Sequence, residues 1–413
     1  MLDKILKKFV KSPTQKAIDR ENKVAAHNYN PIPVLLTRAE GVYCWDIDGK
    51  KYLDMMSAYS AVSIGHSHPR VVEKLTSQAR TLAMTSRAYH TDTLAPYMEK
   101  LVDMTGLDQM LPMNTGAEAV ETAVKAARQW GYAVKKIPED KAEIIVAEGN
   151  FHGRTTTVIS FSTEPAYRKN FGPFTPGFKA VPFGSIEAIA AAITPNTCAV
   201  LMEPIQGEAG IKVPYNGFLR DLRRLCDDKN VLLVLDEVQS GLGRTGKMFC
   251  FQHENILPDV LILGKALGGG LLPVSAIVGT KEVMGLFVPG SHGSTFGGNP
   301  LAAAVGLEAL HVLEEEGMVS NSAILGDYLL DQFRGLNSPL IREVRGKGLW
   351  IGVDFDPAKV SARKVCEKLM EKGILSKETH ETVVRFAPPL TITREQIDWA
   401  LDRFREVLRE IAA

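Results

Sequence analysis

Short apolar runs alternate with helical segments between residues 70 and 310, and this alternation constrains the fold more than any other feature of the sequence. The runs lack the polar–apolar alternation of a half-exposed strand, whereas residues 117–132 and 218–230 carry apolar positions at helical spacing. Strands that are buried on both faces and separated by helices are typical of a mostly parallel sheet covered on both sides. The sequence therefore predicts an α/β fold. The expected strands are EIIVAE (143–148), CAVLMEP (198–204), VLLVLDE (231–237), DVLILG (259–264) and PVSAIVG (273–279).

The two ends of the chain have a different pattern. Residues 43–56 contain two alternating runs joined by Asp-Gly, which predicts a hairpin. After about residue 317, single strands and helices follow one another as in a small α+β domain, and the last helix opens with the capping-box sequence Thr393-x-x-Gln396. We expect the N-terminal segment to complete this small domain. The predicted division is an N-terminal segment (1–57), a large domain (58–316) and a C-terminal small domain (317–413).

Composition and charge exclude several classes of protein. The chain has 413 residues with 48 Lys and Arg against 48 Asp and Glu, so it lacks the basic excess typical of nucleic-acid binding. No apolar run is long enough to cross a bilayer. Five dispersed cysteines without a CxxC spacing predict neither disulfides nor a zinc site, and they favour a reducing cytoplasm. Residues 1–22 predict an amphipathic surface helix, with a targeting segment as the alternative. His66 and His68 precede Pro69 at a predicted helix start, so we expect a loop role for them, with a metal site as the alternative.

Two glycine-rich segments resemble nucleotide-binding motifs but depart from them. GLGRTGKM (241–248) has methionine at position 248, where the phosphate-binding loop needs a hydroxyl for magnesium. GKGLWIG (346–352) has the wrong glycine spacing for a dinucleotide site, and it leads into a strand where a helix is required. Turn-forming glycines are the better interpretation of both.

The stretch LILGKALGGG (261–270) places Lys265 directly after an apolar strand. Burial lowers the pKa of an amine by desolvation, which leaves part of it unprotonated and able to attack an aldehyde. The alternative is a lysine that extends from the strand end to the surface.

Asp236 ends a second apolar strand, 29 residues before Lys265. A carboxylate at a dry strand end normally needs a cationic partner, and the protonated ring nitrogen of pyridoxal phosphate (PLP) is one. A helix cap or a structural ion pair is the alternative for Asp236 considered alone.

Further segments predict a place for a phosphate and a planar ring. Residues 114–117 form a small-residue turn that opens into a helix, whose free N–H groups and dipole favour phosphate, although an ordinary helix cap has the same sequence. Ser294 and Thr295 lie in a glycine-bounded loop, as phosphate ligands or plain turn residues. In GNFHGRT, the pair Phe151–His152 offers an aromatic face and Arg154 follows it.

Seven motifs in order resemble those of the class-III aminotransferases, which are PLP enzymes of fold type I. The motifs are MNTGAEA, FHGRT, EPIQGEAG, LDEVQSGLGRTG, GKALGGG, HGSTFGGNPLA and VRFAPPL, and the resemblance covers nearly the whole chain. It implies that Lys265 holds the cofactor and then acts as acid and base, and that Asp236 pairs with the ring nitrogen. The other implied cofactor residues are Val238 and Phe151 around the ring with His152 beside them, Gln239 near the ring hydroxyl, Gly116 and Ala117 at the phosphate, and Ser294 with Thr295 at the phosphate of a neighbouring subunit in a homodimer.

Within this family, AAHNYNPIPV, SAYSAV, QGEAG and VRFAPPL resemble the ornithine δ-aminotransferases more than the acetylornithine or 4-aminobutyrate aminotransferases, which remain the alternatives. The implied substrates are L-ornithine and 2-oxoglutarate. Arg154 would bind the α-carboxylate of ornithine, and Arg385 the α-carboxylate of glutamate. Glu208 would mask Arg385 while ornithine reacts. Tyr29 and Tyr59 would line the pocket.

Overall fold

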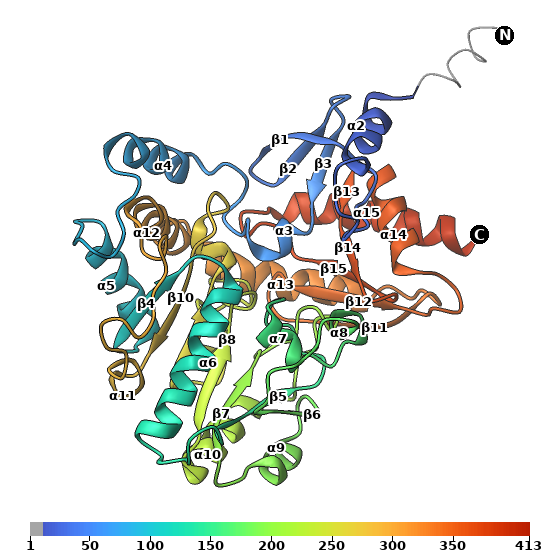
Figure 1. Ribbon diagram of the computed structural model, residues 1–413. Helices are drawn as coiled ribbons and strands as arrows, with labels where there is room; N and C mark the ends of the chain where they lie inside the picture. Colours follow the sequence, from blue (N-terminus) through green and yellow to red (C-terminus); the bar gives the residue numbers. More distant parts are fainter. Residues whose placement is uncertain (1–10) are drawn as a thin grey trace, which may run out of the picture.

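The computed structural model describes residues 11–413, and its centre is a seven-stranded sheet with the order β4-β10-β9-β8-β7-β5-β6 (Figure 1). Strand β10 is antiparallel to both of its neighbours, and the other pairings are parallel. The predicted α/β fold with a mostly parallel sheet is therefore confirmed. The strands are β4 (Gln109–Met113), β5 (Glu143–Ala147), β6 (Phe178–Val181), β7 (Thr197–Met202), β8 (Leu232–Asp236), β9 (Val260–Leu263) and β10 (Ser275–Gly279).

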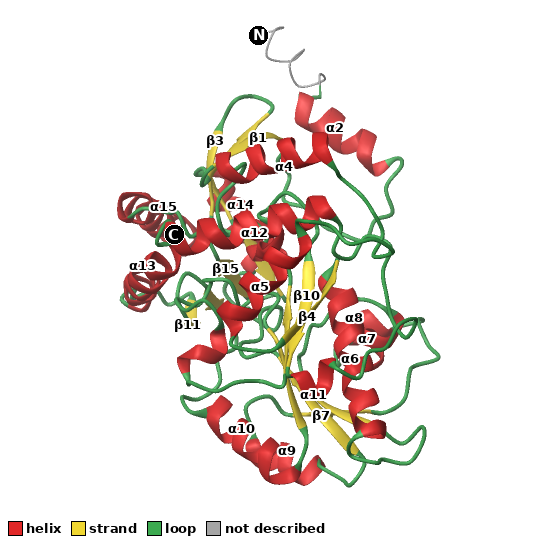
Figure 2. Ribbon diagram, turned by 90° about the vertical axis from the view of Figure 1, so that its left-hand side faces the viewer, coloured by secondary structure: helices red, strands yellow, loops and turns green. Residues whose placement is uncertain are grey.

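Helices cover both faces of this sheet, which Figure 2 shows nearly edge-on. Successive side chains of β8 point to opposite faces, so Leu233 and Leu235 join one hydrophobic cluster and Leu232 and Val234 join the other. The first cluster includes side chains of α4 (Pro69–Thr81), α5 (Leu94–Thr105), α9 (Ile186–Ala192), α10 (Phe218–Lys229) and α12 (Pro300–Glu315). The second includes side chains of α6 (Gly116–Ala133), α7 (Thr156–Ser160) and α11 (Lys281–Met284). Shorter elements of this region are α8 (Pro165–Arg168), η1 (Cys250–His253) and η2 (Lys265–Gly268).

Two four-stranded sheets are built from the ends of the chain. One has the order β1-β2-β3-β13, in which β13 from the C-terminal part pairs in parallel with β3 from the predicted hairpin, through Ile374 and Leu53. The other has the order β11-β12-β15-β14. The strands are β1 (Leu36–Glu40), β2 (Tyr43–Asp46), β3 (Lys51–Asp54), β11 (Ile341–Gly346), β12 (Ile351–Phe355), β13 (Ile374–Leu375), β14 (Lys377–Thr379) and β15 (Val383–Phe386). The helices are α2 (Pro13–Asn22), α3 (Ser57–Ser60), α13 (Met318–Arg334), α14 (Ala362–Glu371) and α15 (Arg394–Ala412).

Local sequence signals account for several of these boundaries. The capping box expected at Thr393 is present, because its hydroxyl accepts a hydrogen bond from the Gln396 N–H and the Gln396 side chain accepts one from the Thr393 N–H. Pro69 is the first residue of α4, as expected for a residue without an N–H. The N-terminal helix predicted over 1–22 corresponds to α2 from Pro13 onward, and its first ten residues lie outside the described part.

Residues 11–413 contain no helix that is both long and apolar enough to span a membrane. The five cysteines are free and buried.

Candidate active site

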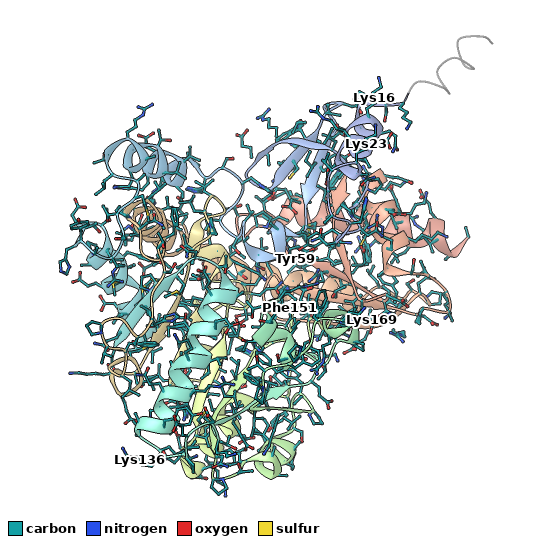
Figure 3. All side chains as sticks on the ribbon, viewed as in Figure 1. Lys16, Lys23, Tyr59, Lys136, Phe151 and Lys169 are labelled. Atoms are coloured by element: carbon teal, nitrogen blue, oxygen red, sulfur yellow. The ribbon has the colours of Figure 1, made fainter. Side chains whose placement is uncertain are left out.

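A cavity of about 190 Å³ opens at the carboxyl edge of the large sheet. It lies where parallel strands end, which is where ligands bind in open α/β sheets. Figure 3 labels Phe151 and Tyr59 in this central region, between the large sheet and the sheets formed by the chain ends. The cavity is lined by Gly116, Ala117, Val120, Phe151, His152, Gly153, Glu203, Ile205, Asp236, Val238, Gln239, Ser240 and Lys265. The structure thus brings together all the predicted cofactor residues except Ser294 and Thr295.

Lys265 reaches the cavity from the turn that follows β9. Its φ of 47° lies in the left-handed region, which is rare for a residue with a side chain and often marks a functional constraint. Desolvation lowers the pKa of the Lys265 amine, although the carboxylates of Glu208 and Asp236 oppose that shift. A fraction of the amine is therefore unprotonated at lower pH than for an exposed lysine.

Asp236 forms a buried pair with His152. The distance from His152 Nδ1 to Asp236 Oδ2 is 2.6 Å, and the second carboxylate oxygen accepts a hydrogen bond from the Val238 N–H at 3.0 Å. Burial acts to lower the pKa of His152, but the hydrogen bond and the charge of Asp236 outweigh it and raise that pKa overall. The sequence suggested His152 as part of a stacking face. Its position beside Asp236 means that it also orients that carboxylate.

Glu203 was not singled out from the sequence, although it also lines the cavity. Its carboxylate accepts hydrogen bonds from the backbone N–H groups of Phe151 (2.9 Å) and Gly207 (3.3 Å). Burial raises the pKa of Glu203 to about 7, while His152 opposes the shift. The signal for this residue was its place at the end of an apolar run, the same signal that identified Asp236.

The N-terminus of α6 faces the cavity through Gly116 and Ala117. A Cβ atom at Gly116 would lie 3.1 Å from Val238 Cγ1, so glycine keeps the space between the helix and the β8 loop open. Ser294 accepts a hydrogen bond from the Asn114 side chain at 2.8 Å, which holds its loop beside this helix end. Thr295 is exposed and does not line the cavity of its own chain.

Arg385 of β15 and Glu208 form an ion pair near Lys265. The distance from Arg385 Nη1 to Glu208 Oε1 is 2.6 Å, and 4% of the Arg385 side chain is exposed. Burial acts to raise the pKa of Glu208, but Arg385 and Lys265 lower it overall, so the pair is charged. The Arg385 Nε atom is buried without a hydrogen-bond partner among the described residues. The guanidinium thus has donor capacity that Glu208 leaves unused.

Tyr59 packs under Arg385, with the guanidinium carbon 4.7 Å from the ring centroid. It belongs to a turn, Ser57–Ser60, in which four successive residues have positive φ. Asp54 holds this turn by accepting hydrogen bonds from the N–H groups of Met56 (2.8 Å) and Ser57 (3.0 Å). His66 Nε2 lies 2.8 Å from the other carboxylate oxygen of Asp54, which gives this loop histidine a structural part.

Arg154 is an exposed residue that lies near Phe151, one of the residues that line the cavity. Its guanidinium carbon lies 4.0 Å from the centroid of the Tyr167 ring and 5.7 Å from that of Phe151. Among the described residues it has no carboxylate within 4.0 Å, so it is available for a ligand carboxylate. Tyr167 gave no signal in the sequence. Tyr29 is 73% exposed and does not line the cavity.

The chain is similar to known proteins over nearly its full length. An ornithine aminotransferase from Brevibacillus brevis is 56% identical over 397 residues, which cover 96% of this chain and 99% of that protein. The ornithine aminotransferase from Toxoplasma gondii, solved with partial occupancy of PLP at its active site, aligns with a TM-score of 0.96 at 41% identity and covers 100% of this chain and 97% of that one. An acetylornithine aminotransferase from Elizabethkingia anophelis aligns with a TM-score of 0.90 at 48% identity, over 97% of this chain and all of that one. Residues 24–408 match the family model of aminotransferase class-III, and the chain therefore belongs to that family.

Proposed function

We propose that this chain is an ornithine δ-aminotransferase that uses PLP. It would transfer the δ-amino group of L-ornithine to 2-oxoglutarate in two half-reactions, which yield glutamate 5-semialdehyde, the precursor of pyrroline-5-carboxylate, and glutamate. The observation that carries the proposal is the contrast between two arginines. Arg154 has a free guanidinium, whereas Arg385 is paired with Glu208.

The residues around the cavity fit PLP. Class-III aminotransferases depend on this cofactor. The N-terminus of α6 at Gly116 suits its phosphate, and Phe151 and Val238 supply apolar walls for its ring. Asp236 suits a protonated ring nitrogen, and the depressed pKa of Lys265 suits attachment to an aldehyde. When bound, PLP supplies a cationic ring that withdraws electrons from the substrate carbon.

The chain's own residues would do three things in each half-reaction. Lys265, as a free amine, would take a proton from the substrate carbon that bears the amino group and deliver it to the aldehyde carbon of the cofactor, on the other side of the nitrogen. Asp236, backed by His152, keeps a negative charge next to the ring nitrogen. Phe151 and Val238 keep the ring in one orientation and exclude water from its faces.

The choice of amino group would follow from the arginines. Arg154 binds the α-carboxylate of ornithine, so the δ-amino group reaches Lys265 and the cofactor. For glutamate, Arg154 holds the side-chain carboxylate and Arg385 takes the α-carboxylate after Glu208 turns away. The Tyr59 ring packs against the Arg385 guanidinium. Tyr29 would contact the α-amino group of ornithine at the entrance of the cavity.

We also propose a homodimer, a division of the chain at residues 57 and 316, and a cytoplasmic location. The exposed Thr295, beside a Ser294 held near α6, supports a phosphate site completed by a second subunit. The pairing of β3 with β13 supports a small domain formed from both chain ends. Five free cysteines are suited to a reducing compartment.

The amino donor that the enzyme prefers can be identified by supplying each candidate donor alone to the PLP-loaded protein. L-ornithine should abolish the visible absorption band of the bound cofactor within one turnover, and 2-oxoglutarate should restore it. N-acetylornithine blocks the α-amino group and 4-aminobutyrate lacks it, so both should react at least about 10-fold more slowly. If either of them bleaches the band faster than ornithine, the acetylornithine or 4-aminobutyrate aminotransferase assignment replaces ours.

Glu208→Ala is expected to affect the two half-reactions unequally. Without its partner, Arg385 competes with Arg154 for the carboxylate of ornithine. The KM for ornithine should therefore rise about 10-fold, which corresponds to the free energy of one charge-assisted hydrogen bond. The glutamate half-reaction should be unchanged or faster, because Arg385 no longer has to be released. Glu208→Gln, which keeps the shape and loses the charge, should be intermediate. Equal changes in both half-reactions would rule out masking.

A further inference from the structure

The main chain around Glu208 is fixed on both sides of that residue. The Thr379 hydroxyl donates a hydrogen bond to the Glu208 carbonyl at 2.5 Å, and the Arg345 Nε–H donates one to the Gly210 carbonyl at 2.8 Å. On the other side, the Gly207 N–H donates to the Glu203 carboxylate at 3.3 Å. Among the described residues, no other donor lies within hydrogen-bond distance of the Glu208 carbonyl. Three side chains therefore hold the main chain of residues 207–210, in addition to the hydrogen bonds that the Gly210 and Ile211 N–H groups donate to the Gly207 carbonyl.

The loop also has little room to shift. Gly210 has a φ of 98°, and a Cβ atom there would lie 2.9 Å from Arg345 Nη2 and 3.1 Å from Val383 Cγ2. On the facing strand, a Cβ atom at Gly352 would lie 3.0 Å from the Gly210 carbonyl oxygen. Thr379 itself is 6% exposed, so water does not readily replace its hydroxyl.

The same small sheet holds both partners of the ion pair. Thr379 is the last residue of β14 and lies opposite Val383 in β15, while Lys377 lies opposite Arg385. The register of β14 and β15 therefore sets the distance between Thr379, which holds the Glu208 main chain, and Arg385, which pairs with the Glu208 side chain.

We infer that Thr379 is a positioning residue for substrate selection, which fixes the Glu208 main chain so that the mask opens by rotation of the side chain alone. This inference rests on the proposed function of Glu208 and goes beyond it by naming the group that sets the closed state. Without the hydroxyl, the partly buried Glu208 carbonyl loses its partner and the loop relaxes. The ion pair weakens, and Arg385 becomes easier to reach for any carboxylate.

The test compares Thr379→Val, which removes the hydroxyl at nearly constant volume, with Thr379→Ser, which keeps it. Binding of glutarate to the PLP-loaded enzyme is measured by calorimetry, because a dicarboxylate without an amino group must open the mask but cannot react. In Thr379→Val the Kd for glutarate should fall about 5-fold and kcat/KM for ornithine should fall by a similar factor, mainly through KM. The kcat/KM for glutamate should rise by up to a similar factor, because glutamate displaces the same Glu208 side chain, and Thr379→Ser should match the parent in all three measurements.

An unchanged or weaker affinity for glutarate in Thr379→Val would overturn the inference. An equal loss of kcat/KM for ornithine in Thr379→Val and Thr379→Ser would also overturn it, because it would indicate a role in packing. If Thr379→Val does not fold, Arg345→Lys replaces it. That change keeps a positive charge near Glu343 and Asp354 but removes the donor to Gly210, and the same shift in glutarate affinity is expected. A parent enzyme that fails to convert ornithine while the glutarate shift appears would refute the proposed function and leave the role of Thr379 standing.

Discussion

Lys265→Ala should lower kcat of both half-reactions by about 10³-fold or more, because Lys265 is the only amine among residues 11–413 that lines the cavity. The other ionisable groups around the cavity are already engaged. Glu203 accepts two backbone hydrogen bonds and Asp236 is paired with His152. Neither can move a proton at the substrate carbon without breaking these contacts.

The control for this change is Lys247→Ala, which removes an exposed lysine from the loop after β8 and should leave activity unchanged. In the absence of cofactor, the melting temperature of Lys265→Ala should equal or exceed that of the parent, since removing a buried amine abolishes its desolvation cost. A small primary amine added to the solution should restore part of the rate by supplying the missing base. Turnover near the parental rate in Lys265→Ala would remove this residue from the mechanism.

The sequence predicted the central strands of the sheet but missed its two edges. Strands β5, β7, β8 and β9 are buried on both faces, so their apolar runs are continuous. The edge strand β4 reads QMLPM, and proline is tolerated there because its missing N–H would not have joined a further strand. The opposite edge, β6, has four residues and one buried side chain. Edge strands are short and partly polar, so they lack the continuous apolar run from which the buried strands were predicted.

The same distinction applies to the site. Lys265 and Asp236 could be predicted because each breaks an apolar run with a charge, which is costly unless it has a function. Tyr167 and Thr379 could not, since an aromatic ring in a four-residue helix and a threonine in a short strand have no unusual local pattern. Their importance depends on contacts with Arg154 and with the Glu208 carbonyl, which only the folded chain creates.

Asp236→Asn should lower both half-reactions by about 10²- to 10³-fold, the usual cost of removing one oriented electrostatic contact in an active site. The amide keeps the shape of the carboxylate but carries no charge, so it no longer favours a proton on the ring nitrogen. Asp331→Asn, an exposed position on α13, is the matched control and should leave the rates unchanged. Loss of rate in only one half-reaction would contradict this role, because both halves require the same electron withdrawal.

The pH dependence of stability gives Asp236 a second test that does not require turnover. Because Asp236 raises the pKa of His152 in the folded protein, their pairing stabilises the fold fully below the unfolded histidine pKa, about 6.5, and this contribution is lost as the pH rises through the raised value. In cofactor-free Asp236→Asn the charge that raises this pKa is gone, so burial dominates and protonation of His152 becomes unfavourable. The variant should therefore be less stable than the parent at pH 6 and approach it at pH 9, as measured by thermal unfolding. A stability difference that is the same at both pH values would mean that His152 and Asp236 are not coupled, and the carboxylate would then have to be oriented by the Val238 N–H alone.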